Sequence, residues 1–317
     1  MRTRITLGLT AAVSCATLVA TVALTRSDSG GSAPSHVTLP TGPYVALGDS
    51  YTAGPKIPAQ NGRPAGCERS DRNYPALLAA DLGLKPAEFR DLSCSGATTA
   101  DLLAAQSTGD GTNPAQVSAV TAATRLVTLG IGGNDIGFSS LVTTCVKAGV
   151  FYQVEKGIRG SKADDAPCRQ WYASRGTDGT DGIETKIGTA GGRVSAALGD
   201  IRRRAPRARV LVVGYPAILP AQDDGCQRAM GLAPGDVAFL RQKEQRLNDV
   251  LRDRARAAGA TYVDTYTPSA GRDACADADV RWIEPLAPTA AAAPVHPNER
   301  GQLGMSRAVL DALRATG

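Results

Sequence analysis

The chain has 317 residues, of which 43% are hydrophobic and 21% are charged, and its formal net charge is +5 at pH 7. This is the composition of an ordinary globular protein with room for one large core, which excludes a disordered chain. The positive charge is too small to make nucleic acid the expected partner.

The N-terminus predicts a secretory signal. A basic start at Met1–Arg4 precedes an apolar stretch from Ile5 to Leu24, and a Gly/Ser spacer runs from Ser27 to Ser35. We expect residues 1–33 to be signal peptide and spacer, with cleavage between 23 and 33, and residues 40–317 to form one secreted domain. An uncleaved membrane anchor is the alternative, because the apolar stretch approaches membrane-spanning length.

Six cysteines follow the signal, and an even number in an exported chain favours disulfides over metal. There is no Cys-x-x-Cys pair and there are only two histidines, so we expect no metal and no cofactor. Among the fifteen connectivities that six cysteines allow, we favour sequential pairing, because each pair then brackets one loop-rich segment. The expected disulfides are Cys67–Cys94, Cys145–Cys168 and Cys226–Cys275.

In chain order, short apolar segments alternate with helical stretches. The predicted strands are Tyr44–Leu47, Glu88–Leu92, Arg125–Leu129, Arg209–Val213 and Thr261–Asp264. The predicted helices are Asn73–Leu82, Asn113–Ala122, Ile183–Arg204, Pro234–Ala258 and Glu299–Ala315. Between them, Ser139–Asp181 is interpreted as a loop-and-helix insertion over the site. This alternation predicts an α/β fold, a central parallel five-stranded sheet with helices on both faces.

Three candidate residues each follow a strand. Ser50 lies in Gly48-Asp49-Ser50, and Gly96 and Asn134 lie in the loops after the next two strands. Because ligands bind beyond the carboxyl ends of parallel strands, all three loops should open on one edge of the sheet. A serine on a tight turn between strand and helix can be a nucleophile, although the same residues also suit an ordinary turn.

Ester hydrolysis by serine needs a base and donors for the developing oxyanion. His36 lies in the N-terminal spacer, so His296 is the histidine available within the folded body. The candidate donors are the backbone N–H groups of Ser50 and Gly96 and the side-chain amide of Asn134.

These blocks together resemble the SGNH (GDSL) hydrolases. The blocks are Gly-Asp-Ser-Tyr-Thr-Ala-Gly at 48–54, Gly96, Gly-Gly-Asn-Asp at 132–135 and His-Pro-Asn at 296–298. They occur in the family's order over nearly the whole chain after the signal. The chain is most similar to the secreted actinobacterial lipases and esterases of that family, which also carry three disulfides, and Arg281–Pro285 adds to the match.

The resemblance implies a flavodoxin-like three-layer α/β/α fold. It also implies Ser50 as nucleophile, His296 as base, and an oxyanion hole formed by the Ser50 N–H, the Gly96 N–H and the Asn134 side chain.

One position departs from the family pattern. Many members place an aspartate three residues before the histidine, where this chain has Ala293. We therefore predict a Ser50–His296 dyad in which the Ala293 backbone carbonyl accepts the second imidazole N–H. The competing carboxylates are Glu284, Asp264 and Glu299.

The expected function is that of a secreted serine esterase or lipase that hydrolyses lipid acyl esters such as triacylglycerol through an acyl-enzyme. A phospholipase A-type enzyme and a carbohydrate acetyl esterase are the enzymatic alternatives, and an inactive surface binding protein is the non-enzymatic one. We expect a monomer that takes a small-molecule or lipid ester substrate, makes transient contact with a lipid interface and does not bind nucleic acid.

Overall fold

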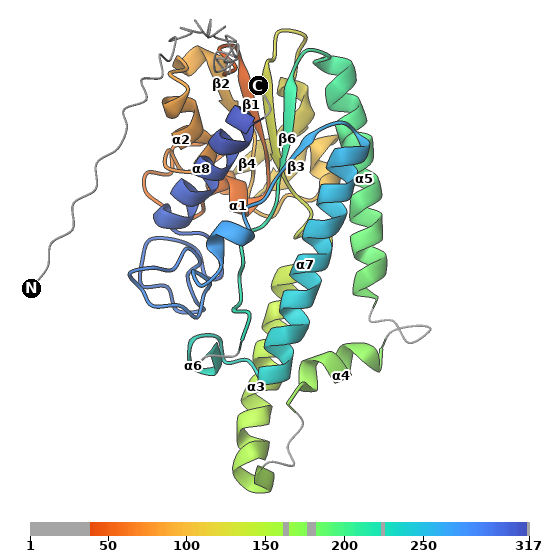
Figure 1. Ribbon diagram of the computed structural model, residues 1–317, viewed down its shortest axis with the longest axis vertical. Coiled ribbons are helices and arrows are strands. Elements are labelled where there is room, and N and C mark those ends of the chain that lie inside the picture. The colour runs from red at the N-terminus through yellow and green to blue at the C-terminus, as the bar shows by residue number, and fades with distance from the viewer. Residues whose placement is uncertain (1–38, 161–164, 176–181, 223–225, 316–317) are drawn as a thin grey trace, which may run out of the picture. The chain divides into compact units, whose positions relative to one another are not determined.

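Five parallel strands form the central sheet of the protein, seen here in a computed structural model (Figure 1). Their order is β2-β1-β5-β6-β7, so the chain starts in the second position and winds to both sides. The strands are β1 (Tyr44–Gly48), β2 (Phe89–Asp91), β5 (Leu126–Gly130), β6 (Arg209–Val213) and β7 (Thr261–Val263). All five predicted strands are confirmed, and the pairing of Gly48 with Gly130 brings β1 and β5 to an end at the same level.

The structure describes residues 39–160, 165–175, 182–222 and 226–315. The expected signal peptide at residues 1–33 lies outside these residues. In the part of the chain that is described, no helix has both the length and the apolar character to cross a membrane.

Helices cover both faces of the sheet, because successive strand residues point to opposite sides. Tyr44 and Ala46 of β1 pack with α2 (Tyr74–Asp81) and α8 (Glu299–Ala315) in one apolar cluster. Val45 and Leu47 face the other cluster, which contains the buried sides of α5 (Ile183–Arg204) and α7 (Pro234–Ala257). The three-layer α/β/α arrangement is therefore confirmed (Figure 1).

The predicted helix at Asn113–Ala122 is wrong. The chain forms a two-stranded antiparallel hairpin of β3 (Gln106–Thr108) and β4 (Gly111–Asn113), followed by a 3-10 turn at Gln116–Ala119. Asn113 is paired with Gln106 in β4, and the extended conformation that Pro114 favours for the residue before it suits this strand. The buried Gln116 side chain then binds both the N–H and the carbonyl of Gly48, at 2.7 and 3.0 Å.

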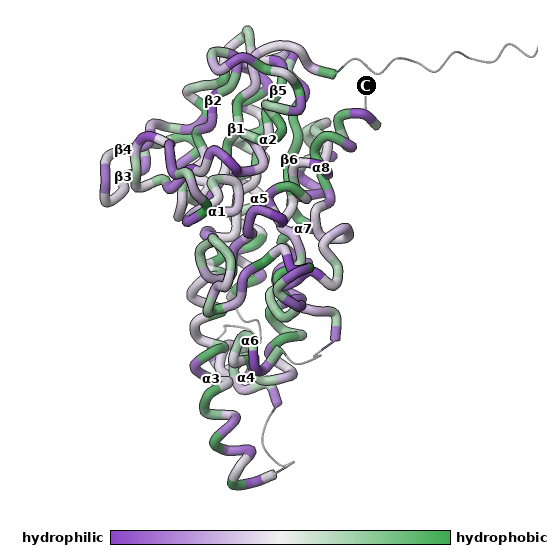
Figure 2. Tube along the Cα trace, turned by 90° about the vertical axis from the view of Figure 1, so that its left-hand side faces the viewer, coloured by the Kyte–Doolittle hydropathy of each residue, from purple (hydrophilic) through white to green (hydrophobic). Residues whose placement is uncertain are grey.

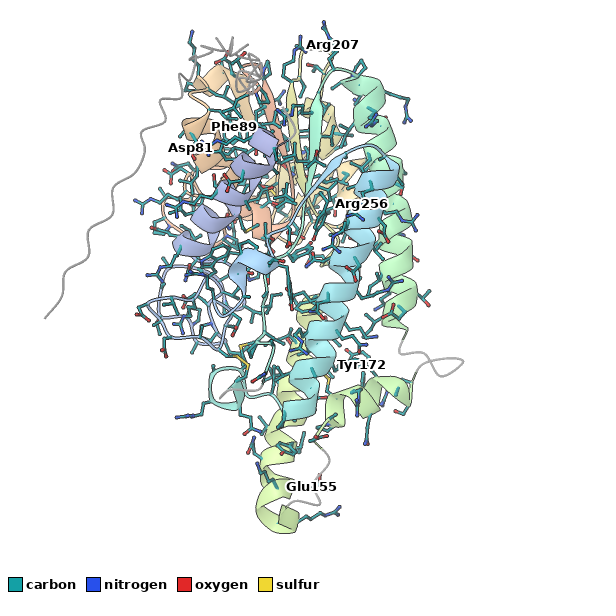
Figure 3. All side chains as sticks on the ribbon, in the orientation of Figure 1. Asp81, Phe89, Glu155, Tyr172, Arg207 and Arg256 are labelled. Atoms are coloured by element: carbon teal, nitrogen blue, oxygen red, sulfur yellow. A yellow bond between two sulfur atoms is a disulfide. The ribbon has the colours of Figure 1, made fainter. Side chains whose placement is uncertain are left out.

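The predicted insertion at Ser139–Asp181 contains two helices in its described part. They are α3 (Phe138–Arg159) and α4 (Pro167–Ala173). The Cys145–Cys168 disulfide joins them. Tyr172 of α4, labelled in Figure 3, packs on Phe239 of α7 with ring centroids 6.1 Å apart. This disulfide and the Cys67–Cys94 and Cys226–Cys275 disulfides follow the sequential pairing that the sequence favoured.

Several short elements complete the described fold. The short helices are α1 (Ser50–Ala53) and α6 (Cys226–Met230), and further 3-10 turns lie at Ala65–Cys67, Pro86–Glu88, Thr99–Leu102 and Thr267–Ser269.

Gly48 is the residue of β1 that leaves no room for a side chain. A Cβ there would lie 2.2 Å from the Thr52 Oγ1 and 2.6 Å from the Gly130 carbonyl oxygen. We therefore expect Gly48→Ala to lower the free energy of unfolding by about 2–3 kcal/mol, as overpacked core substitutions do.

Gly188→Ala is the matched control, because Gly188 lies on the exposed side of α5 and a Cβ there meets nothing within 4 Å. It should raise the free energy of unfolding by about 0.5–1 kcal/mol. Urea denaturation with the disulfides intact measures both values, and a Gly48→Ala protein as stable as the wild type would contradict the packing described.

Candidate active site

Ser50 is the first residue after the turn that links β1 to α1. The Asp49 side chain caps this turn by accepting the Tyr51 N–H at 2.9 Å. As the first residue of the helix, Ser50 has an N–H with no acceptor inside the helix. Gly54 ends α1 with a φ of 74°, a left-handed conformation that suits glycine. The turn therefore places both the hydroxyl and the N–H of Ser50 at the carboxyl edge of the sheet.

The Ser50 hydroxyl lies directly beside the His296 ring, although the two residues are 246 positions apart in the sequence. Ser50 Oγ and His296 Nε2 are 2.8 Å apart, and His296 Nδ1 is 2.8 Å from the Pro294 carbonyl oxygen. A carbonyl can only accept, so Nδ1 must donate its hydrogen to Pro294. Nε2 is then the unprotonated nitrogen, ready to take the serine proton.

The predicted role of Ala293 needs correction, because Pro294 accepts the imidazole N–H. The Ala293 carbonyl instead accepts the His296 backbone N–H at 3.2 Å and closes a turn. Pro294 occupies the second position of this turn, and Val295 the third with a φ of 60°. In such a turn the carbonyl of the second residue points outward, which leaves Pro294 free to bind the ring.

Val295 holds a left-handed conformation that is unfavourable for a β-branched residue. Two hydrogen bonds keep it there: the Tyr51 hydroxyl donates to its carbonyl at 2.6 Å, and its own N–H donates to the Glu284 carbonyl at 3.0 Å. The Tyr51 ring also lies against the His296 ring, with centroids 5.0 Å apart. Tyr51 therefore supports the base from two directions.

None of the three competing carboxylates is a hydrogen-bond partner of the His296 ring within the described residues. Asp264 accepts hydrogen bonds from the turn that follows β7. Glu299 forms an ion pair at the start of α8, where it is half exposed. Glu284 is fully buried within its own loop.

Glu284 nevertheless organises the loop that carries the base. Its side chain accepts hydrogen bonds from Arg281, from Asn298 and from two backbone N–H groups. Its own N–H donates to the His296 carbonyl at 3.0 Å. Burial alone would raise the pKa of Glu284, but these hydrogen bonds hold it below the usual value. Glu284 is thus an ionised anchor of the histidine loop.

Asn134 and Gly96 come from two loops that contact each other. One amide hydrogen of Asn134 donates to the Ala97 carbonyl at 2.9 Å, which leaves its second hydrogen available. Asp135 accepts the Thr99 N–H at 2.9 Å and ties the same loops together. Gly96 has a φ of 76° and is exposed, and it is not among the residues that line the cavity beside Ser50.

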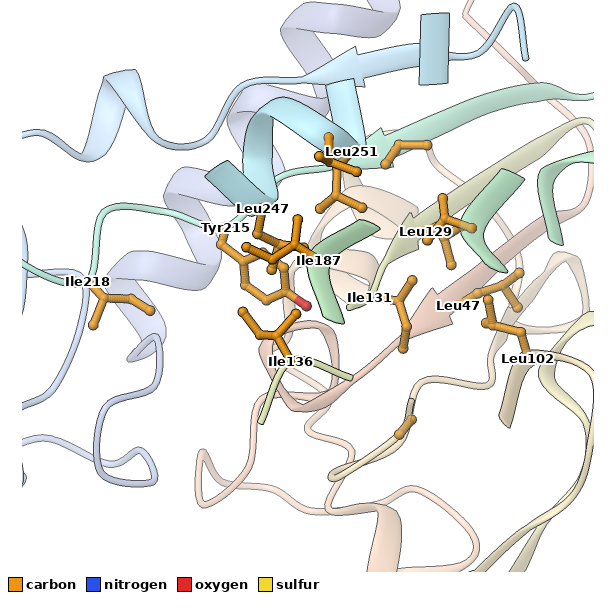
Figure 4. Packing of buried hydrophobic residues seen from close by; sticks show 14 of the residues in the cluster. Leu47, Leu102, Leu129, Ile131, Ile136, Ile187, Tyr215, Ile218, Leu247 and Leu251 are labelled. Carbon is orange, nitrogen blue, oxygen red and sulfur yellow. The ribbon is translucent and has the colours of Figure 1, made fainter. Parts of the chain in front are cut away.

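Tyr215 joins the nucleophile turn to the Asn134 loop, a role that the sequence reasoning missed. Its hydroxyl donates to the Asp49 carboxylate at 2.5 Å and accepts the Gly133 N–H at 2.8 Å. Burial raises the pKa of Asp49 to about 7, although the hydrogen bond from Tyr215 acts in the opposite direction. The sequence did offer one sign of this role. Tyr215 follows Gly214 directly after β6, so it lies at the same carboxyl edge of the sheet as Ser50 and Asn134. Figure 4 shows Tyr215 packed among buried apolar side chains.

A cavity of about 190 Å³ opens beside the Ser50–His296 pair. The apolar side chains that line it are Phe138, Val142, Ile218, Leu247, Leu286, Pro294 and Val295. Glu244 also lines it and accepts the Ile218 N–H at 3.2 Å, and burial raises the pKa of Glu244 well above the usual range. The described residues contain no group of three or more His, Cys, Asp or Glu side chains arranged to hold a metal ion.

The protonation of His296 can be tested directly. Burial lowers the pKa of His296 below 6.5, although its hydrogen bond to Pro294 acts in the opposite direction. The folded protein therefore binds this proton less readily than the unfolded chain, so stability should fall as the pH drops through the range below 6.5. In an NMR titration of the ring signals, we expect the midpoint for His296 below 6.5.

A His36→Gln variant leaves one histidine in the chain and identifies its signal. A midpoint above 6.5 would mean that the ring is stabilised in its charged form, contrary to the contacts described.

The chain is similar to several characterised proteins. Residues 46–303 match the GDSL-like Lipase/Acylhydrolase family. Lipase 2 of Streptomyces coelicolor is 40% identical over 297 residues, which cover 93% of this chain and 94% of that protein. A lipase of Streptomyces rimosus is 31% identical over 76% of this chain and 75% of its own length.

Two crystal structures share the fold. Phospholipase A1 from Streptomyces albidoflavus NA297 is similar with a TM-score of 0.66 and 28% identity, over 87% of this chain and 99% of that one. The extracellular lipase from Streptomyces rimosus has a TM-score of 0.64 and 29% identity, over 86% of this chain and 99% of that one. With its family match spanning the nucleophile turn, the Asn134 loop and the histidine loop, the chain belongs to the GDSL-like lipase/acylhydrolase family.

Proposed function

We propose that the protein is a secreted serine hydrolase that cleaves the carboxylic ester bonds of lipids. The observation that carries the proposal is the 2.8 Å contact between Ser50 Oγ and the unprotonated nitrogen of His296, beside an apolar cavity. A hydroxyl paired with a neutral imidazole is the arrangement of an activated nucleophile.

In the proposed reaction, Ser50 attacks the ester carbonyl while its proton moves to His296 Nε2. The resulting imidazolium keeps its Nδ1–H on Pro294 and returns the Nε2 proton to the leaving alcohol. An acyl-enzyme remains on Ser50. His296 then deprotonates a water molecule that attacks this ester, and the fatty acid leaves as the serine is regenerated.

The proposed base works as one half of a dyad. The Pro294 carbonyl fixes the orientation and tautomer of His296 at 2.8 Å. Because this partner is a neutral dipole, it stabilises the imidazolium less than a carboxylate would. Burial lowers the pKa of His296 despite the opposing effects of the Pro294 hydrogen bond and the Glu68 charge, so the ring favours its uncharged form.

The proposed oxyanion donors are the Ser50 N–H, the Gly96 N–H and the second amide hydrogen of Asn134. The hydrogen bond from Asn134 to Ala97 fixes the amide plane, so the remaining hydrogen has a defined direction. A preorganised donor of this kind contributes about 2.7–4 kcal/mol to lowering the barrier. Tyr215 supports the set, because it links Asp49 beside the nucleophile to Gly133 beside Asn134.

The cavity supports an acyl chain as the group bound beside Ser50. Its walls include several aliphatic side chains and the Phe138 ring, and the raised pKa of Glu244 favours an uncharged carboxyl in that wall. The volume of about 190 Å³ is below the range of roughly 300–1,000 Å³ that is common for drug-sized ligands. We therefore propose that the substrate carries short to medium acyl chains and that it is a triacylglycerol.

Phospholipid is a second candidate substrate, favoured by the structural similarity to phospholipase A1 from Streptomyces albidoflavus. Export is supported by the predicted N-terminal signal, by the three disulfides and by the similarity to the extracellular lipase from Streptomyces rimosus.

A substrate panel combined with active-site labelling tests the proposal. The panel contains p-nitrophenyl esters from acetate to palmitate, emulsified triacylglycerol and phosphatidylcholine, and a fluorophosphonate serves as the label. We expect one adduct at Ser50, faster turnover of short to medium chains than of acetate, and a loss of more than about a thousandfold in Ser50→Ala.

The alternatives give different results. Activity confined to acetyl esters would favour an acetyl esterase and contradict the lipid assignment. An unlabelled Ser50 with no turnover of any ester would indicate a binding protein.

A further inference from the structure

Helix α3 carries an apolar face that is exposed in the described part of the chain. Its inner face is buried through Leu141, Cys145, Gly149 and Tyr152. The opposite face should be polar in a surface helix, yet in its second half it carries four large apolar residues, which we call the outer stripe. The outer stripe consists of Val150, Phe151, Val154 and Ile158, which are 57%, 75%, 60% and 80% exposed.

The outer stripe continues a line of residues that begins at the cavity. Ser139 and Thr143, in the first two turns of α3, line the cavity beside Ser50. Lys147, Val150, Val154 and Ile158 follow Thr143 at steps of three or four, so they lie on the same side of the helix. With a rise of 1.5 Å per residue, the line from Thr143 to Ile158 is about 22 Å long.

This part of α3 projects past the core of the domain. The helix runs away from the sheet and beyond α4 and α6 (Figure 1), and Figure 2 shows hydrophobic residues among the hydrophilic ones toward its end. The Cys145–Cys168 disulfide fixes the first half of α3 to α4, and the Tyr172–Phe239 contact holds α4 on α7. The outer stripe therefore lies on the half of α3 that continues beyond this brace.

The size and chemistry of the outer stripe fit a lipid surface better than a protein partner. A stable dimer needs about 800 Å² and 20–30 residues on each side, far more than four side chains provide. None of the four lines any of the five main cavities formed by the described residues. A lipid surface requires only a protruding apolar ridge, and the exposed Lys147 on the same line can place its ammonium group among headgroups.

We propose that the outer stripe docks the enzyme on the surface of an ester-lipid phase. The inference rests on the proposed function and deepens it. With the stripe in the surface, the line along α3 leads from the lipid directly to the cavity wall at Thr143. The stripe then raises the rate on aggregated lipid and is not needed for an ester dissolved in water.

Paired variants of full-length protein test this assignment. The stripe variant is Phe151→Gln with Ile158→Gln, which keeps good helix formers in α3. The control variant is Leu103→Gln with Val280→Gln, which removes two apolar residues that are 52% and 38% exposed elsewhere on the surface. Each is assayed on dissolved p-nitrophenyl butyrate and on emulsified tributyrin, and in a Ser50→Ala background each is sedimented with phosphatidylcholine vesicles.

We expect the stripe variant to lose about tenfold in both emulsion rate and vesicle binding, because two inserted apolar side chains are removed. Its rate on dissolved ester should stay within about twofold of the wild type, which also shows that it folds. The control variant should match the wild type in all three assays.

Unchanged emulsion rate and vesicle binding would overturn the proposal. So would an equal loss on dissolved and emulsified esters, which would indicate an effect on the fold. A wild-type dimer that the stripe variant dissociates, without a change on emulsions, would make the stripe a self-association surface. If the wild type hydrolyses no ester, the proposed function fails, and vesicle binding still decides the role of the stripe.

Discussion

The hydrogen bond between Ser50 and His296 is the interaction on which the candidate site depends. It joins the turn after the first strand to the loop before the last helix. Because these two segments are far apart in the sequence, each is held in place by its own hydrogen bonds. Gly48 and Gln116 hold the nucleophile turn, while Glu284 and Tyr51 hold the histidine loop. The parallel sheet supplies the common edge at which the two supports meet.

Among the described residues, the ring of His296, the proposed base, is oriented by a carbonyl and bonds no carboxylate. The Pro294 carbonyl provides direction, and the burial of the ring favours its uncharged form. The nearby acids serve the structure: Glu284 neutralises Arg281 inside the loop, and Asp49 caps the nucleophile turn. The proposed dyad would rely on fixed geometry more than on charge, and the left-handed conformation of Val295 is part of that geometry.

The sequence predicted the strands and the pairing of Ser50 with His296, because short buried apolar runs and motif blocks are local signals. It did not predict the hairpin before Gln116 or the role of Tyr215, since their partners Gly48 and Asp49 lie far away in the chain. The sequence predicted Ala293, not Pro294, as the residue whose carbonyl accepts the His296 ring N–H. The correct partner depends on the left-handed conformation of Val295, which no local propensity favours. The sequence also did not predict that the outer stripe is exposed, because this depends on which face of α3 packs against the rest of the fold.

The most direct test of the dyad is the turnover number on a dissolved ester after each competing acid is changed to its amide. We expect Asp264→Asn, Glu299→Gln and Glu284→Gln each to keep kcat within about tenfold of the wild type, because none of these carboxylates bonds the His296 ring. A loss near a thousandfold in any one of them, at an unchanged melting temperature, would show that a carboxylate completes a triad and would contradict the account.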